Sequence, residues 1–195
     1  MGASAPFQLM IPRKLTVLDK QKLINHLTTL RGEDRRLRFG GTVSDDYIVE
    51  YITKSFDTDC KWFGVDHIDG MIVAACHASI ANGEAELGCS VDPEYRNQGY
   101  AQAMFDRAVT WLRTRGITEV FMHCLSENGA MKHIARKNDM TVVSEYGESD
   151  ATVQIEPATP VTVAEDVYLD RIALYDMYVK NNFHAFDFYW RRNRT

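Results

Sequence analysis

Val91-Asp92-Pro93-Glu94-Tyr95-Arg96-Asn97-Gln98-Gly99-Tyr100-Ala101 is the stretch that decides the fold of this chain. An apolar strand ends at Val91, and Pro93 cannot extend its ladder because proline has no N–H to donate. A helical pattern follows the loop, with apolar residues three and four positions apart: Ala101, Met104, Phe105, Ala108, Trp111 and Leu112. A helix that starts from a loop leaves its first-turn N–H groups unpaired, and these groups favour an anion. Gly99 allows a ligand to come close to the backbone, and Arg96 adds a charge suited to phosphate.

The segment from Arg96 to Ala101 resembles motif A of the GNAT (Gcn5-related) N-acetyltransferases, whose pattern is Gln/Arg-x-x-Gly-x-Gly/Ala. The surrounding frame of strand, Val-x-Pro, aromatic residue, arginine, glycine and helix makes the resemblance more specific. In that family the loop holds the pyrophosphate of acetyl-CoA. The resemblance therefore implies acetyl-CoA as co-substrate, bound by Arg96, Asn97, Gln98, Gly99, Tyr100, Ala101 and Gln102.

Composition indicates one globular domain, because 45% of the 195 residues are hydrophobic and 25% are charged. The net charge of -5 argues against a nucleic acid partner and suits a cationic acceptor such as an amine. Since there is no apolar run of bilayer length and no secretory signal, we expect a cytoplasmic protein without a membrane partner. The four cysteines show no C-x-x-C spacing, so we expect free, buried thiols and no metal site.

Periodicity and turn residues predict a mixed α/β (α+β) chain with a mostly antiparallel sheet. We expect strands over residues 7–11, 61–66, 71–81, 84–91, 118–125, 141–146 and 151–156. We expect helices that end near residues 29, 54, 115 and 138, with a charged segment from Arg31 to Arg38 between the first two. The order β-α-α-β-β-β-α-β-α-β-β resembles that of the GNAT fold, which implies an acetyltransferase domain over residues 1–157.

Residues 158–195 form an extension that the GNAT core does not require. An amphipathic helix is predicted over residues 163–180, with Val163, Val167, Leu174 and Tyr178 near one face. An aromatic tail follows, with Phe183, Phe186, Phe188, Tyr189 and Trp190. The extension is interpreted either as a homodimer contact or as a helix that packs back on its own sheet.

Acetyl transfer to an amine requires a base for the amine and a donor for the thioester carbonyl. In GNAT enzymes the strand before the loop supplies both. The resemblance implies that Cys89, Ser90 and Val91 lie along the pantetheine arm, with a backbone N–H near Ser90 or Val91 facing the carbonyl oxygen. It also implies that the side chain of Asn128, an N-cap candidate for the next helix, contacts the arm of CoA.

Glu86 is the first candidate for the general base. Its neighbours Ala85 and Leu87 are apolar, and a carboxylate in apolar surroundings can have a raised pKa that suits proton abstraction near neutral pH. The stretch from Ala85 to Val91 resembles that of bacterial protein lysine acetyltransferases, in which the glutamate at this position is the base. Glu33-Asp34-Arg35-Arg36-Leu37-Arg38-Phe39 resembles a second stretch of the same domains. Glu84, beside a turn, is interpreted as solvated.

His123 is the rival base, because a neutral imidazole can also accept the proton. It occupies the place where ribosomal-protein acetyltransferases carry a glutamate. The chain departs from the family at Ala135, where a tyrosine commonly protonates the CoA thiolate. The general acid therefore has no assigned residue.

The leading hypothesis is an acetyl-CoA-dependent N-acetyltransferase that transfers acetyl directly to a primary amine, either a protein lysine or a small amine. The alternative is a non-catalytic acyl-CoA-binding sensor or regulatory module, which the missing tyrosine at Ala135 favours.

Overall fold

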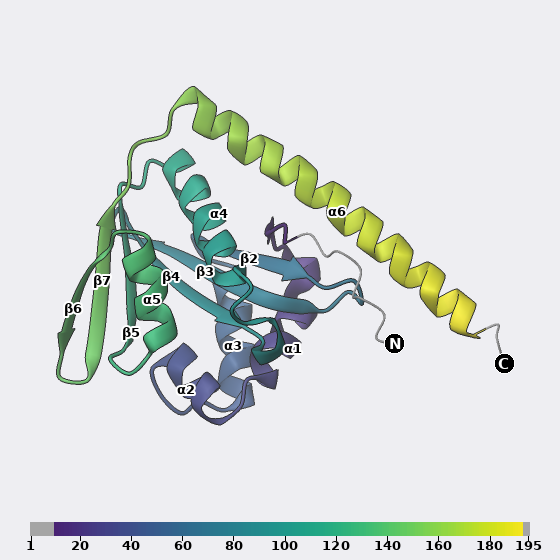
Figure 1. Ribbon diagram of the computed structural model, residues 1–195, viewed down its shortest axis with the longest axis horizontal. Coiled ribbons are helices and arrows are strands. Elements are labelled where there is room, and N and C mark those ends of the chain that lie inside the picture. Colours follow the sequence, from purple (N-terminus) through teal and green to yellow (C-terminus); the bar gives the residue numbers. More distant parts are fainter. Residues whose placement is uncertain (1–9, 193–195) are drawn as a thin grey trace.

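A seven-stranded sheet with the order β1-β2-β3-β4-β5-β7-β6 forms the centre of the molecule (Figure 1). The computed structural model describes residues 10–192, with side chains through residue 180 and at residue 182. The strands are β1 (Arg13–Lys14), β2 (Cys60–Asp66), β3 (Ile72–Ala81), β4 (Glu84–Val91), β5 (Glu119–Leu125), β6 (Thr141–Glu145) and β7 (Glu148–Gln154). Among these strands only β4 and β5 pair in parallel; the other pairs are antiparallel.

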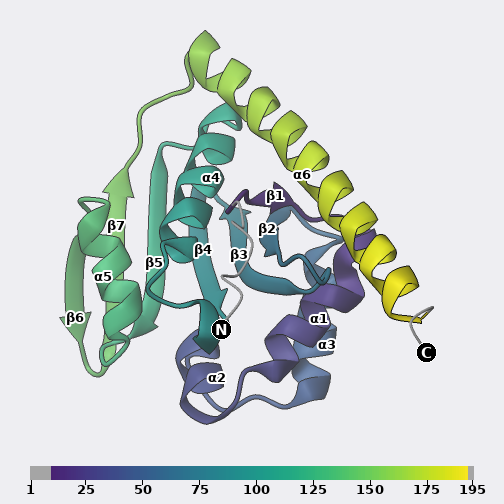
Figure 2. The same cartoon turned by 45° about the vertical axis from the view of Figure 1, so that its right-hand side comes forward.

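Helices cover both faces of the sheet (Figures 1 and 2). They are α1 (Lys20–Thr29), α2 (Gly32–Phe39), α3 (Asp45–Ser55), α4 (Tyr100–Thr114), α5 (Gly129–Lys137) and α6 (Pro160–Arg192), with two 3₁₀ turns, η1 (Val17–Asp19) and η2 (Pro93–Tyr95). One core lies between the sheet and α4 and α5, and a second lies between the sheet and α1 and α3. The expected fold class is confirmed.

Side-chain alternation along the central strands assigns residues to these two cores. Ala85 and Leu87 of β4 belong to the core under α4 and α5. Ala75 of β3 and Trp62 of β2 belong to the core under α1 and α3. The even-numbered residues of β4, Glu86 among them, therefore lie on the face of the sheet that α1, α2 and α3 cover.

His77 of β3 is a structural residue. Its ring stacks on Trp62 with 4.4 Å between centroids, and Nδ1 lies 2.9 Å from the hydroxyl of Tyr51. Burial, together with the positive charge of Arg38, lowers the pKa of His77 to about 3. The imidazole is neutral at neutral pH.

The first third of the chain differs from expectation in two places. Residues 10 and 11 are not in a strand, and the first strand is the two-residue β1; the rest of the expected strand over residues 7–11 lies outside the described residues. The charged segment is a helix, α2, which ends at Gly40 in the left-handed region with φ 71°. Acidic residues at the start of α2 and arginines at its end complement the helix dipole.

Tight turns follow the expected positions. Asn82 and Gly83, with φ 54° and 86°, join β3 to β4. Tyr146 and Gly147 join β6 to β7 with similar angles, so β7 begins at Glu148, three residues earlier than expected. All four cysteines are free thiols, but only Cys76 and Cys124 are buried, and the others are half-buried.

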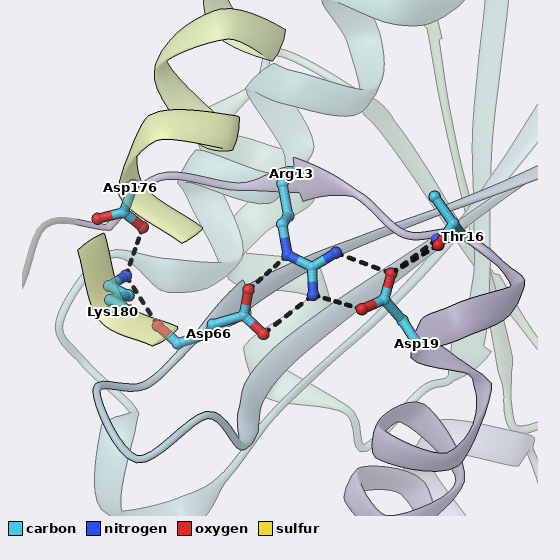
Figure 3. A network of polar contacts seen from close by, with 6 residues as sticks. All are labelled: Arg13, Thr16, Asp19, Asp66, Asp176 and Lys180. Carbon is cyan, nitrogen blue, oxygen red and sulfur yellow. Dashed lines mark hydrogen bonds and ion pairs between the residues drawn. The ribbon is translucent and has the colours of Figure 1, made fainter. Parts of the chain in front are cut away.

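α6 packs on the body largely through charged side chains. Arg107 of α4 and Lys14 of β1 both pair with Asp166 and Asp170, and Arg107 is buried. Further along α6, Lys180 Nζ donates to the carbonyl oxygen of Asp66 at 2.9 Å (Figure 3).

Many apolar residues of α6 face away from the body, although Ala173 is buried and Leu169, Ile172 and Met177 are half-buried. Those exposed are Val161, Val163, Val167, Tyr168, Leu174, Tyr175, Tyr178 and Val179, which we call the α6 stripe. The helix continues through the aromatic tail, whose side chains lie outside the described ones. Within residues 10–192, α6 and the other helices lack the combination of length and apolar character that a membrane span requires.

Candidate active site

A fork between β4 and β5 creates the site. The two strands pair over only three positions, ending where Glu86 lies opposite Phe121. Beyond this point β4 continues to Val91 and β5 to Leu125 without further pairing between them in the described structure. The β5-facing edge of Gly88 to Val91 therefore offers backbone groups to an extended ligand, as a sheet edge offers them to an added strand.

A pocket of about 560 Å³ opens at this fork. From β4, the loop and α4 it is lined by Cys89, Ser90, Val91, Tyr95, Arg96, Asn97, Gly99, Tyr100, Ala101 and Gln102. Asn128 also lines it. Every residue expected to bind the co-substrate is therefore in the lining except Gln98, which is exposed and donates from Nε2 to the carbonyl oxygen of Glu94 at 3.1 Å.

Further residues line the pocket that the sequence did not assign to it. They are Leu30, Asp34, Leu37, Arg38, Ala130, Met131, His133, Ile134 and Lys137. The lining residues after Asn128 recur at helical spacing on α5, so the periodicity of the sequence could have predicted that they share one face of that helix. Lys137, His133 and Arg38 add basic groups to the arginine of the loop, which suits a polyanionic ligand.

The loop before α4 has the backbone that an anion site needs. Asn97 and Gly99 lie in the left-handed region, with φ 58° and 93°. Gly99 stands at the N-cap of α4, so the N–H groups of the first helical turn open into the pocket side of the loop. A side chain at Gly99 would be strained by this φ and would meet Met10 at 3.7 Å.

Arg96 and Asn128 are already engaged by protein groups. Arg96 Nη2 lies 2.9 Å from a carboxylate oxygen of Asp34, and its Nε donates to the carbonyl oxygen of Val91 at 3.2 Å. The side chain of Asn128 accepts from the N–H of Met131 at 3.1 Å and so caps α5, as expected. Both side chains remain in the pocket lining.

The two candidate bases lie outside the pocket lining, on the same side of the sheet as α2. Glu86 is exposed, because Ala85 and Leu87 point to the opposite face; the expectation of apolar surroundings for its carboxylate is wrong. His123 donates from Nδ1 to Asp150 Oδ1 at 2.7 Å. This hydrogen bond raises the pKa of His123, and the charge of Glu86 contributes, so the two groups interact electrostatically.

A raised pKa makes His123 more often protonated near neutral pH, which weakens it as a base. Ala135, at the position of the missing tyrosine, is buried in the core under α4 and α5 and does not reach the pocket lining.

The fork, the loop at the start of α4 and an exposed carboxylate at the fork together suit acyl transfer from a CoA thioester. The fold and the pocket thus define the class of this protein as N-acetyltransferase.

Comparison with known proteins agrees. The sequence pattern of the acetyltransferase (GNAT) family matches residues 28–139, and the chain belongs to this family, with acetyl-CoA as co-substrate. The GNAT domain of S. lividans PAT has a similar structure, with a TM-score of 0.64 and 20% identity over 74% of this chain and 89% of that one. No protein of curated function matches the sequence.

Two further structures share the fold at low identity. The PaiA N-acetyltransferase of Thermoplasma acidophilum, in complex with coenzyme A, gives a TM-score of 0.57 and 19% identity over 74% of this chain and 98% of that one. A spermidine N-acetyltransferase SpeG variant from Vibrio cholerae gives a TM-score of 0.55 and 16% identity over 73% and 92%.

Proposed function

We propose that the chain transfers the acetyl group of acetyl-CoA directly to a primary amine, with a protein lysine as the preferred acceptor. The observation that carries the proposal is the position of Glu86 at the last paired residue of β4, where the fork begins, three residues before Cys89, the first β4 residue in the pocket lining. A base at this point stands between the donor pocket and the open face of the sheet, from which an amine can approach.

Each part of the site has a role in this proposal. The edge of Cys89 to Val91 pairs with the pantetheine arm, and a backbone N–H near Ser90 or Val91 polarises the thioester carbonyl. The loop from Arg96 to Gln102 holds the pyrophosphate, and Asn128 contacts the arm. Glu86 takes a proton from the amine, which then attacks the carbonyl carbon without a covalent enzyme intermediate. His123 is the second candidate for this base.

Acidic groups around the open face support a cationic acceptor. The carboxylates of Asp150, Glu148 and Glu86 all contribute to the raised pKa of His123, so they lie close enough to form one negative region. A protein lysine is preferred because the Ala85–Val91 stretch resembles that of protein lysine acetyltransferases, and the structurally similar S. lividans domain belongs to a protein acetyltransferase.

Thiol release from acetyl-CoA with a panel of amines tests the proposal. We expect release with lysine-containing peptides and slower release with spermidine or other small amines. If no amine gives release while acetyl-CoA still protects the protein against heat unfolding, the chain is a non-catalytic acyl-CoA sensor instead. Release that is fastest with a small amine would overturn the choice of acceptor and keep the reaction class.

For residues 158–195 we propose a homodimer contact through the α6 stripe. An exposed stripe of valines, tyrosines and a leucine along one helix favours association. Its occupant is a second copy rather than a lipid surface, because the exposed charged residues of α6 through residue 180 are Glu165 and Arg171, whereas helices that lie on membranes have basic polar faces. We keep the expectation that the protein acts in the cytoplasm.

The dimer is expected to dissociate when Val167 and Leu174 are both replaced with glutamate. Sedimentation at several protein concentrations should give twice the chain mass for the wild-type protein and the chain mass for the variant. Val143→Glu is a matched control, because Val143 on β6 is as exposed as Val167, at 53%. A wild-type chain that sediments as a monomer throughout would contradict the contact.

A further inference from the structure

Three polar side chains, one from α1 and two from the end of β4 and the residues after it, meet behind the pocket wall at Ser90. His26 of α1 lies with Nε2 at 2.8 Å from Ser90 Oγ of β4. The Nδ1 of the same ring lies 3.1 Å from Asp92 Oδ1, just beyond the end of β4. The second distance is that of an ion pair and not of an aligned hydrogen bond. The arrangement places one imidazole between a hydroxyl and a carboxylate.

Burial and backbone contacts fix this arrangement. Ser90 is buried against α1 but is part of the pocket lining, and His26 is buried with Leu23 and Leu27 on the inner face of α1. The N–H of Asp92 donates to the carbonyl oxygen of Val73 at 2.9 Å, which holds the loop beside β3. A buried imidazole with a hydrogen-bond partner on Nε2 and a carboxylate 3.1 Å from Nδ1 has a defined orientation, as a proton relay requires.

On β4 the lining of the pocket offers two side chains with a proton to give, Cys89 and Ser90, and Sγ of Cys89 already donates to Sγ of Cys76 at 2.8 Å. Tyr95 and Tyr100 also line it, but they belong to η2 and to the first turn of α4, at the end where the loop holds phosphate. Ala135 has no proton to give and is buried in the core. Ser90 is the hydroxyl in the lining that lies on the strand edge itself.

We propose that Ser90 donates the proton that the leaving CoA thiolate takes up, with His26 as the relay behind it and Asp92 as the residue that positions His26. This inference rests on the proposed acetyltransferase function and deepens it by naming the general acid.

When the tetrahedral adduct collapses, the C–S bond breaks and its electron pair stays on sulfur. The hydroxyl proton of Ser90 moves to sulfur, and the Nε2 proton of an imidazolium at His26 moves to the serine oxygen. The proton that Glu86 has taken from the amine goes to solvent, and a solvent proton recharges His26. Asp92 stabilises the imidazolium between turnovers.

Ser90→Ala should lower kcat for thiol release by about 10²-fold, at the lower end for acid catalysis because a thiolate is a good leaving group. KM for acetyl-CoA should stay unchanged, and Ser90→Thr, which retains a hydroxyl, should recover most of the rate. The decisive measurement uses the selenoester analogue of acetyl-CoA. A selenolate is a weaker base than a thiolate and leaves without a proton, so Ser90→Ala should lose its defect with this donor.

Other outcomes would overturn the inference. An equal defect with both donors would mean a structural role for Ser90, and an unchanged kcat would mean no role. Acetyl groups that accumulate on Ser90 of the wild-type protein without amine would mean covalent catalysis. His26→Gln, which can hydrogen-bond but has no proton that it can transfer, should match Ser90→Ala on both donors. It serves where the alanine variant does not fold. If the wild-type chain turns over no amine, the proposed function fails together with this inference; turnover with a fully active Ser90→Ala removes this inference alone.

Discussion

Replacing Glu86 with glutamine should lower kcat for acetyl transfer by about 10²–10⁴, because the substitution keeps the size of the side chain but removes the carboxylate that accepts the proton. Binding of acetyl-CoA should be unaffected, since Glu86 lies outside the pocket lining. Initial rates of thiol release at saturating acetyl-CoA and amine measure the first effect. Protection against heat unfolding by acetyl-CoA measures the second.

Glu84→Gln is the matched control for this experiment. Glu84 is on the same strand and the same face, is also exposed, and stands two residues further from the pocket, beside the turn. Its replacement removes the same charge and should leave kcat within about twofold of the wild-type value, as expected for a group that takes no part in proton transfer. A comparable loss in both variants would point to the overall charge of the face as the cause.

His123→Ala separates the two candidate bases. With Glu86 as the base, this variant retains most of its activity. A normal rate in Glu86→Gln combined with a loss in His123→Ala would reverse the assignment. The rate of an enzyme with His123 as base would also rise with pH around a midpoint above the ordinary histidine value of 6.5, because the hydrogen bond to Asp150 raises the pKa of His123.

The sequence predicted the central strands well, because their turns and alternation are local properties. β3 and β4 lie within one residue of their expected bounds, and the Asn82–Gly83 turn joins them as its left-handed preference requires. The sequence did not predict α2, because apolar periodicity is the pattern that predicts helices. α2 is stabilised instead by charges that complement its dipole and by its cap at Gly40. Local patterns identify elements that bury an apolar stripe and miss those that do not.

The candidate site was predictable where residues follow one another along the chain. The loop before α4 and the strand before it form a continuous segment, and that segment lines the pocket. The contributions of Arg38 from α2 and His26 from α1 depend on how distant elements pack, which no local pattern contains. The sequence left the orientation of α6 open for a related reason: its contacts with Arg107 are ion pairs between segments more than fifty residues apart.

Replacing Arg13 with methionine should lower the free energy of unfolding by about 3–5 kcal/mol, since it leaves two buried carboxylates without their cation. Arg13 pairs with Asp19 at 2.6 Å and with Asp66 on its other side, and all three residues are buried (Figure 3). Denaturant unfolding at neutral pH measures the loss. Lys54→Met, which breaks an exposed pair with Glu50, is the control and should change stability little.

The pH dependence of this loss tests its cause. Burial acts to raise the pKa of Asp19, but hydrogen bonds from Arg13 and Thr16 outweigh it, so the pKa of Asp19 lies below its ordinary value of 3.8. A depressed carboxylate pKa stabilises the fold above the unfolded-state value, and this contribution is lost as pH falls through the folded-state value. In Arg13→Met the effect of burial, which favours the protonated acid, is opposed only by the hydrogen bonds from Thr16. The difference in stability between the two proteins should therefore be largest at neutral pH and shrink below pH 3.8. A difference that stays constant with pH would mean that lost packing of the arginine side chain, and not the unpaired charge, destabilises the variant.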